Sequence, residues 1–372
     1  MRLALRGGTL LERVALRANL VPTPAAEAWG GVAASGVLVA AVRTGVVARL
    51  AGAPATPEQI ARDLCLAPTP TRLLVDCLVA AGHARRSQDG TVRLARRDRR
   101  WLDPESEVGV ARFVNACGDY FDWWRDLDGV IETGASVEQH DRGAEDPYWR
   151  RYILGQLDLA RLFAPEVARR LALPENAASV LDVGGGHGWY SAMLCRRHPG
   201  LTATVLDLPG SARVGREVIE AAGLAHTVAF LDGDARTAEF PGGQDAVLCF
   251  NLLHHLTEAE IPELFARAAE ALKPGGTLAV LDAFAEAPGG GGGGVGSWSG
   301  SRSWSRPQSW SRSRSNAAAA YLALFVRLTS GSTVHSPAAL RTWLAGAGFD
   351  PPRAVRSARI PGLALYQACK RW

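Results

Sequence analysis

This sequence has few lysines and no pair of cysteines at the spacing of a redox or zinc motif. Lys273 and Lys370 are the only lysines among 41 basic residues, and 37 acidic residues leave a net charge of +4. A charge this small argues against obligatory nucleic-acid binding. The six cysteines, at positions 65, 77, 117, 195, 249 and 369, form neither a C-x-x-C pair nor a Cys/His zinc spacing. We therefore expect reduced thiols in a cytoplasmic protein that needs no metal.

Long hydrophobic runs are also missing. Residues 1–8 lack the continuous apolar core of a signal peptide, and no uncharged apolar run reaches 18 residues. The sequence therefore predicts neither secretion nor a membrane span. Its 372 residues are 47% hydrophobic, which is enough for two cores and favours two domains.

The most informative segment is an apolar run that ends in an acid and a glycine cluster, Val180-Leu181-Asp182-Val183-Gly184-Gly185-Gly186-His187-Gly188. This pattern predicts a buried strand and a tight turn, because glycine lets the backbone approach a ligand that a Cβ would push away. The next apolar strand ends in Asp207, where a carboxylate can bind both hydroxyls of a ribose. Together they predict a nucleoside pocket at the carboxyl edge of a parallel sheet.

Glycine spacing separates two kinds of nucleotide site. Dinucleotide-binding domains use G-x-G-x-x-G, with the diphosphate on the helix N-terminus. Here the spacing is G-x-G-x-G, and Trp189 stands where the third glycine would be. An indole at that point would obstruct close packing of helix on strand. His187, inside the turn, could bind a ligand, but we expect a tolerated loop residue.

Further strands follow along the chain, each ending in polar residues. Phe230–Asp232 leads into Gly233-Asp234-Ala235, and Asp245–Phe250 leads into a loop with His254 and His255. An amphipathic helix over 258–272 ends at Lys273-Pro274-Gly275-Gly276 and precedes a strand over Thr277–Asp282. Strands that alternate with helices predict an α/β domain.

These segments, in this order and at these intervals, resemble the class I S-adenosylmethionine-dependent methyltransferases. The resemblance is to the two-domain small-molecule O-methyltransferases of plant phenolic and bacterial polyketide metabolism, and it covers roughly residues 10–372. It implies a Rossmann-like, mostly parallel sheet with an antiparallel last strand, S-adenosyl-L-methionine as cofactor, and a homodimer. The segments that carry it are Asp182–Gly188, Asp207-Leu208-Pro209, Gly233-Asp234, Leu252-Leu253-His254 and Lys273-Pro274-Gly275-Gly276.

The resemblance also implies a cofactor site. Glycines would flank the methionine part with Asp182 beneath it, Asp207 would accept the ribose hydroxyls, and Asp234 would accept the adenine amino group. Leu208 and Ala235 would line the adenine ring. The implied residues are Asp182, Gly184, Gly186, Gly188, Asp207, Leu208, Gly233, Asp234, Ala235 and Phe250, the last standing where plant members carry Lys.

The catalytic base implied by the resemblance is His254. A phenol with a pKa of about 10 is a poor nucleophile at neutral pH, and an imidazole with a pKa near 6.5 can accept its proton. Asp282 would orient His254, in place of a glutamate in the plant enzymes. Val334 falls near the position of their second glutamate. Two alternatives stay open: His255 is the base, or His254 only packs or hydrogen-bonds.

The N-terminal region predicts a winged helix. Thr56-Pro57-Glu58-Gln59 is a helix start with a capping box, and Thr69-Pro70 starts a second helix that stops at Gly82. His83–Ser87 and Thr91–Ala95 form a hairpin. Its arginines could bind DNA, but the resemblance favours a dimerisation domain, in which apolar helices over 10–20 and 25–50 interlock two subunits.

The domain organisation follows from these segments: an N-terminal dimerisation domain over 1–105, a helical linker over 106–170, and a cofactor-binding domain over 171–372. Aromatic helices over 113–124 and 148–163 either line the acceptor pocket or form ordinary core. A low-complexity insert over 288–315 repeats Ser-Trp-Ser-Arg; we expect a tolerant loop, with RNA binding as the alternative. Helices over 321–328 and 337–345 and a hairpin of 354–359 with 363–369 complete the chain.

The sequence therefore predicts a homodimeric, cytoplasmic O-methyltransferase. Its acceptor would be the hydroxyl of an aromatic small molecule, with no nucleic-acid or membrane partner. Two other functions stay open. The same fold could methylate nitrogen or carbon or perform other tailoring chemistry, or the chain could be a winged-helix regulator that binds DNA and senses a nucleoside.

Overall fold

The computed structural model describes residues 9–284, 317–356 and 362–371. The chain divides into two compact units, Met1–Phe121 and Asp122–Trp372. The insert over 288–315 lies outside the described residues, as do 357–361 of the closing hairpin. The division into a dimerisation domain, a linker and a cofactor domain stays a prediction.

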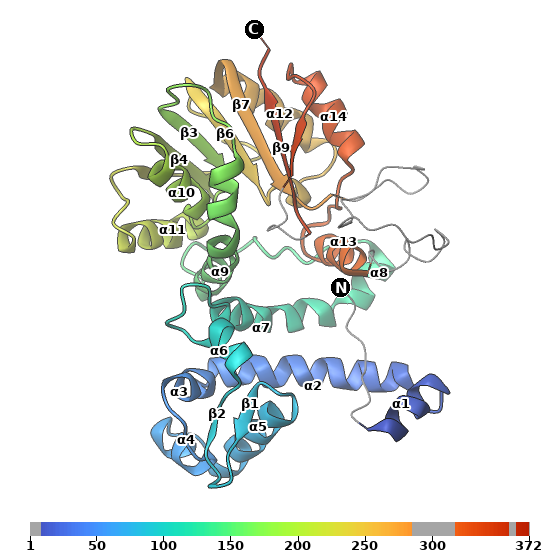
Figure 1. The fold of residues 1–372 in the computed structure, drawn as a ribbon. Helices are drawn as coiled ribbons and strands as arrows, with labels where there is room; N and C mark the ends of the chain where they lie inside the picture. The colour runs from blue at the N-terminus through green and yellow to red at the C-terminus, as the bar shows by residue number, and fades with distance from the viewer. Residues whose placement is uncertain (1–8, 285–316, 357–361, 372) are drawn as a thin grey trace, which may run out of the picture. The chain divides into compact units, whose positions relative to one another are not determined.

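The first unit begins with apolar helices. They are α1 (Leu10–Arg17), α2 (Thr23–Arg43) and α3 (Val46–Gly52), shown in blue in Figure 1. In α2, Trp29 and Val32 are 78% and 72% exposed. Within the described residues, α2 is the one helix whose length and apolar composition would suffice to cross a membrane.

A helix–helix–hairpin arrangement follows, as predicted: α4 (Pro57–Asp63), α5 (Pro68–Ala80), β1 (Ala84–Arg86) and β2 (Val92–Leu94), then α6 (Arg96–Leu102). The capping box of Thr56 and Gln59 is confirmed. The predicted start of α5 at Thr69-Pro70 is wrong by two residues, because Pro68 takes the first helical position and the N-cap is Ala67. Ile60, Val75 and Leu78 anchor the core of this unit.

The second unit contains a seven-stranded sheet in the order β5-β4-β3-β6-β7-β9-β8. The first five strands run parallel, and β9 and β8 are antiparallel, so the predicted mostly parallel sheet is confirmed. The strands are β3 (Ser179–Val183), β4 (Thr202–Asp207), β5 (Val228–Asp232), β6 (Gln244–Phe250), β7 (Leu272–Asp282), β8 (Arg353–Val355) and β9 (Ala364–Cys369).

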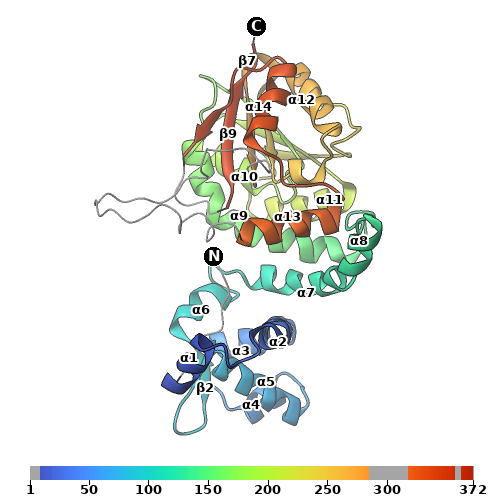
Figure 2. The same ribbon diagram turned by 90° about the vertical axis from the view of Figure 1, so that its right-hand side faces the viewer.

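Helices cover both faces of this sheet. Side chains alternate along each strand, so Val180 and Leu248 join one core, with α9, α10 and α11, whereas Leu181 and Val247 join the other, with α12 and α14. Figure 2 shows α12 and α14 next to each other. The helices are α7 (Ala111–Arg125), which spans the division between the units, α8 (Leu127–Thr133), α9 (Pro147–Arg170), α10 (Trp189–Arg197), α11 (Pro209–Ala221), α12 (Glu260–Ala271), α13 (Ala317–Ser330) and α14 (Pro337–Gly346).

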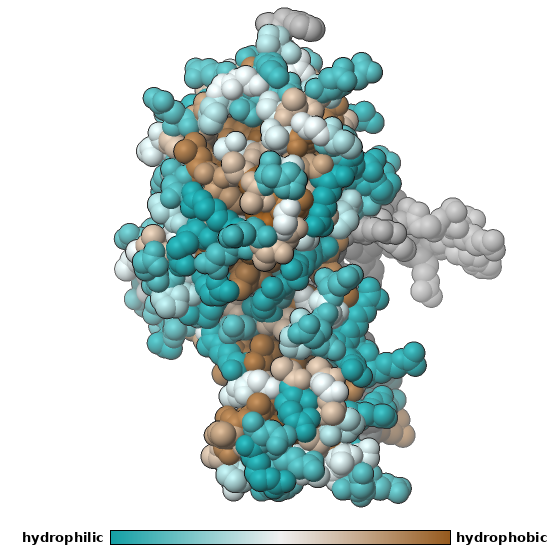
Figure 3. Space-filling view, turned by 90° about the vertical axis from the view of Figure 1, so that its left-hand side faces the viewer, coloured by the Kyte–Doolittle hydropathy of each residue, from teal (hydrophilic) through white to brown (hydrophobic). Residues whose placement is uncertain are grey.

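Polar side chains cover much of one face of this unit. Figure 3 shows the side of α10 and α11 as mostly hydrophilic, with scattered apolar patches. This distribution is normal for a folded domain with its apolar residues inside. The parallel strands place their carboxyl ends at one edge of the sheet, where register pairs Val183 with Leu206 and Asp207 with Asp232.

Candidate active site

The glycine turn connects β3 to α10 and brings the backbone close to its neighbours. Gly184, Gly186 and Gly188 have positive φ angles of 70°, 54° and 65°. A Cβ on Gly184 would lie 2.9 Å from Leu252 Cδ1, and a Cβ on Gly188 would lie 3.0 Å from Phe230 Cζ. A side chain would therefore be strained by the backbone conformation at all three positions, and it would also be crowded at Gly184 and Gly188.

Close packing at this turn comes from a glycine that the sequence analysis did not find. A Cβ on Gly215 of α11 would lie only 2.4 Å from the carbonyl oxygen of Gly186. Trp189 does not obstruct the turn, since Gly188 caps α10 ahead of it. The His187 ring is buried, and its Nδ1 accepts a hydrogen bond from Trp189 N at 3.0 Å. This hydrogen bond fixes His187 at the start of α10.

Asp182 lies beneath the turn, 1% exposed. Its Oδ2 accepts a hydrogen bond from the Ser191 hydroxyl at 2.7 Å, while Oδ1 has no hydrogen-bond partner among the described residues. Burial raises the pKa of Asp182 to about 7. A buried carboxylate oxygen without a donor is unfavourable, so this group fits a ligand that brings a donor or a positive charge.

Asp207 ends β4 and is bound to the same turn. Its Oδ2 accepts a hydrogen bond from Gly186 N at 2.6 Å, and Oδ1 accepts one from Leu208 N at 2.7 Å. Burial raises the pKa of Asp207 to about 6, against the effect of these bonds. Each carboxylate oxygen has further lone pairs, so both can still accept hydroxyl groups. The structure therefore brings Asp182, Asp207 and the glycine turn together.

The loop after β5 holds three more of the predicted residues. Gly233 N donates to Asp207 O at 2.9 Å, and Asp234 Oδ1 accepts from Arg236 N at 2.8 Å. Arg267 of α12 fixes the loop, because its guanidinium donates to Ala235 O at 2.7 Å and to Ala238 O at 2.8 Å. Arg267 could not be predicted from the sequence, since nothing local marks a contact across this distance in the chain.

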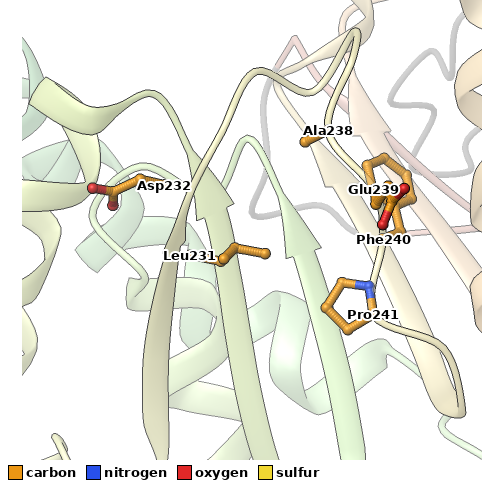
Figure 4. A pocket seen from close by; sticks show the side chains of 6 residues that line it. All are labelled: Leu231, Asp232, Ala238, Glu239, Phe240 and Pro241. Carbon is orange, nitrogen blue, oxygen red and sulfur yellow. The ribbon is translucent and has the colours of Figure 1, made fainter.

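A surface depression lies beside this loop. Its walls are Leu231, Asp232, Ala238, Glu239, Phe240 and Pro241 (Figure 4). None of these residues belongs to the predicted cofactor set. Phe250 lies away from solvent, 4% exposed, with its ring edge-on to Tyr190 at 5.2 Å. A cofactor-binding role for Phe250 stays a prediction.

His254 and Asp282 meet at the ends of β6 and β7. His254 lies in a short 3₁₀ helix, η1 (Leu253–His255), and its Nδ1 is 2.7 Å from Asp282 Oδ1. The carboxylate also accepts from Ala283 N at 2.7 Å. Burial alone lowers the pKa of His254, but the Asp282 charge and hydrogen bond raise it, and the net pKa is above the ordinary value. Because Nδ1 faces the carboxylate, Nε2 is the nitrogen left to exchange a proton.

Residues after α13 hold the turn that carries His254. The Ser330 hydroxyl lies 2.8 Å from Val326 O and 3.0 Å from His254 O, so its one proton is shared by the two carbonyl groups, and the Ser332 hydroxyl donates to Leu256 O. His335 Nε2 is 3.0 Å from Leu253 O and 3.3 Å from Leu256 O, so this nitrogen carries the proton. We name Ser330, Ser332 and His335 the turn clamp. Sequence analysis missed it because its contacts join segments far apart in the chain.

Two more histidines lie next to His254. The ring centroids of His254 and His255 are 4.2 Å apart, and those of His255 and His140 are 5.1 Å apart. His140 stacks on Trp149, with centroids at 5.6 Å and planes at 12°, and lies 5.2 Å from the Tyr152 ring. His140 could not be predicted from the sequence, because it lies in a loop without a motif.

The glycine turn and the histidine–aspartate pair thus lie at the same carboxyl edge of this sheet, where the sequence predicted the cofactor and the base. The family model of the O-methyltransferase domain matches residues 133–291. A 3-hydroxy-5-methyl-1-naphthoate 3-O-methyltransferase of Streptomyces sahachiroi is 27% identical over 271 residues, covering 70% of this chain and 77% of the relative. The tetracenomycin polyketide synthesis 8-O-methyl transferase TcmO of Streptomyces glaucescens is 28% identical over 337 residues, covering 88% and 90%.

A solved structure agrees with the fold. Human N-acetylserotonin methyltransferase in complex with SAM superposes with a TM-score of 0.77, at 17% identity, over 99% of this chain and 100% of that chain. The chain is an S-adenosylmethionine-dependent methyltransferase, and its residues 133–291 are similar to the O-methyltransferase domain. This decides between the enzyme and the DNA-binding regulator in favour of the enzyme.

Proposed function

We propose that this enzyme transfers a methyl group to a hydroxyl group of an aromatic small molecule in secondary metabolism, with His254 as general base. The observation that carries the proposal is the 2.7 Å contact between His254 and Asp282 at the edge of the sheet where the glycine turn lies. The names of the naphthoate and tetracenomycin relatives support an aromatic acceptor with a hydroxyl group.

The residues present fit the cofactor. When bound, S-adenosylmethionine supplies an electrophilic methyl group on a sulfonium centre. Asp182, with its unpartnered buried Oδ1 in the part of the chain described, would face the positively charged end. Asp207 would accept the ribose hydroxyls, and Asp234 the adenine amino group, between Leu208 and Ala235. A carboxylate suits paired hydroxyls, and apolar faces suit an uncharged purine.

His254 would remove the proton of the acceptor hydroxyl through Nε2 as the oxygen attacks. Asp282 keeps the imidazole oriented and stabilises the positive charge that develops on it. The turn clamp holds three carbonyl groups around His254, so the ring is preorganised. Alignment of the attacking oxygen with the methyl group is the remaining contribution of the protein.

The finer features of the enzyme are part of the same proposal. We propose a cytoplasmic homodimer that joins through α1 and α2. In these helices Leu10, Leu11, Trp29 and Val32 are 76%, 79%, 78% and 72% exposed. An apolar surface of this kind is unfavourable in water and is typical of a protein interface, and we assign a second copy of the chain as its partner.

Calorimetric titration with S-adenosylhomocysteine tests the cofactor site. The wild type should bind, and Asp207→Ala should lose binding. Asp232→Ala is the matched control, because Asp232 also ends a strand but is exposed and paired with Arg216. If a folded wild type did not bind, the proposed site would be wrong.

Methyl transfer to naphthols, followed by mass spectrometry and NMR of the product, tests the reaction. We expect an O-methyl product, and a loss of about 10²–10⁴-fold in kcat for His254→Ala. A His254→Ala enzyme that keeps the wild-type rate would exclude His254 as base.

A further inference from the structure

Two histidines beside His254 have no role in the chemistry described above. His255 comes from η1, and His140 comes from the loop between α8 and α9, so segments far apart in the sequence converge here. Their ring centroids are 5.1 Å apart with an interplanar angle of 65°. Both residues are intermediate between buried and exposed.

Both imidazoles carry an unsatisfied polar atom. Among the described residues, Nδ1 of His140 and Nδ1 of His255 are buried and have no hydrogen-bond partner. Such atoms are rare in native proteins and call for an explanation. Aromatic packing alone does not provide one, because a phenylalanine could stack on Trp149 without burying a nitrogen.

The pair is uncharged at neutral pH. Burial first, then the neighbouring His254 and Arg236, lowers the pKa of His140 to about 4, and burial with His254 and His140 lowers the pKa of His255 well below its ordinary value. Neutral imidazole offers one donor and one acceptor. A hydroxyl or carbonyl oxygen on an uncharged ring matches these groups better than a carboxylate or an ammonium group.

We propose that His140 and His255 bind a second oxygen of the aromatic acceptor, next to the hydroxyl that His254 deprotonates. The 4.2 Å between the rings of His254 and His255 places the pair within reach of a substituent on a neighbouring carbon. This inference rests on the proposed function, because it places the acceptor beside His254. It predicts that the enzyme selects ortho- or peri-dioxygenated aromatics.

Binding of two probes tests the pair without any need for turnover. We would titrate 2-naphthol and 2,3-dihydroxynaphthalene into protein saturated with S-adenosylhomocysteine. The wild type should bind the diol about 5–10-fold more tightly, which is the effect of one or two hydrogen bonds. His255→Phe and His140→Phe keep an aromatic ring and should reduce this preference to about twofold or less.

A conservative variant separates the hydrogen bond from packing. Asparagine places a polar atom near the position of Nδ1, so His255→Asn should keep most of the preference, and the exposed His226→Phe should keep all of it. Equal binding of the two probes by the wild type, or binding of neither, would overturn the proposal. So would Phe variants that retain the preference for the diol.

Methylation of both probes, 2-naphthol and 2,3-dihydroxynaphthalene, is assayed separately. If the wild type methylates both probes but binds them equally, the pair is wrong and the proposed function stands. If it prefers the diol, loses this preference in the Phe variants and methylates neither probe, the proposed function is wrong, and the pair is a binding site for a dioxygenated aromatic without a reacting hydroxyl beside it.

Discussion

Two opposing effects act on His254, and their balance sets the pH dependence of the enzyme. Burial disfavours its charged form, and Asp282 favours it more strongly, so its pKa lies above the ordinary 6.5. The base must be neutral, so kcat/KM should fall as pH falls through this raised pKa. In Asp282→Asn the charge that raises the pKa of His254 is removed, and burial, which lowers this pKa, remains. The acid limb should then move below pH 6.5, and the maximal rate should drop about 10-fold or more.

A profile of kcat/KM against pH for both proteins checks this. The folded-state pKa of His254 is raised, so its pairing with Asp282 stabilises the fold fully at low pH and this contribution is lost as pH rises. Urea unfolding should therefore show a larger difference between the two proteins at about pH 6 than at about pH 9. An acid limb that stays in place would mean that a different group titrates.

Asp182 is an acid whose pKa is raised in the folded protein, so its burial makes the fold less stable as pH rises. Its pKa is raised from 3.8 to about 7, so the native state holds a proton that the unfolded chain releases. The free energy of unfolding of the cofactor-free protein should therefore fall as pH rises between these values. Asp182→Asn should weaken this dependence, measured by urea unfolding at about pH 5 and about pH 8. Some pH dependence would remain, because the pKa of Asp207 is also raised. If Asp182→Asn left the change of unfolding free energy with pH as in the wild type, the raised pKa would not belong to Asp182.

At the scale of elements, the turn clamp should affect catalysis more than acceptor binding. His335→Leu removes the donor to Leu253 O and Leu256 O, so the turn that carries His254 loosens. We expect kcat to fall about 10-fold with KM nearly unchanged. His335→Gln restores a donor near Nε2 and should recover most of the rate. A purely structural role would instead lower stability in both variants and leave kcat per folded enzyme unchanged.

The packing of α9 on α11 depends on a glycine. A Cβ on Gly210 would lie 2.3 Å from Trp149 Cδ1, which is a steric clash. The indole of Trp149 is rigid and buried, so it has little room to move away. Gly210→Ala should therefore lower the free energy of unfolding by about 1–3 kcal/mol, measured in urea. Gly242→Ala is the control, because its Cβ would have no neighbour within 4 Å. Equal stability of the two variants would show that Trp149 can move.

These elements also show what a sequence can reveal. The strands ending at Val183, Asp207 and Asp232 were predictable, because an apolar run and the polar residue after it are local signals. His254 and Asp282 could be named from their places after two strands. The partners His335, Arg267 and His140 could not, since each acts through contacts with distant segments. Gly210 and Gly215 lie inside a helix, where a glycine gives no local sign of the side chain or backbone against it.

At the scale of the whole molecule, the exposed apolar helices raise the question of what covers them. Helix α2 has the length and composition to cross a membrane, and only 11% of its apolar window is buried. A second copy of the chain and a lipid surface would therefore both suit it. The two partners differ in one respect: a dimer forms in aqueous buffer at a fixed mass, whereas a membrane helix needs lipid or detergent.

Light scattering of the purified protein should give twice the mass of one chain. Trp29→Asp combined with Val32→Asp places charges on the exposed surface of α2 and should halve this mass while the fold of the second unit persists. Ile131→Asp is the matched control, since Ile131 is also 67% exposed but lies on α8 in the other unit. A wild type that is monomeric in buffer and sediments with lipid vesicles would assign α2 to the membrane. A wild type that is monomeric in buffer and does not bind lipid vesicles would contradict the proposed dimer, because neither partner would then cover the apolar surface of α2.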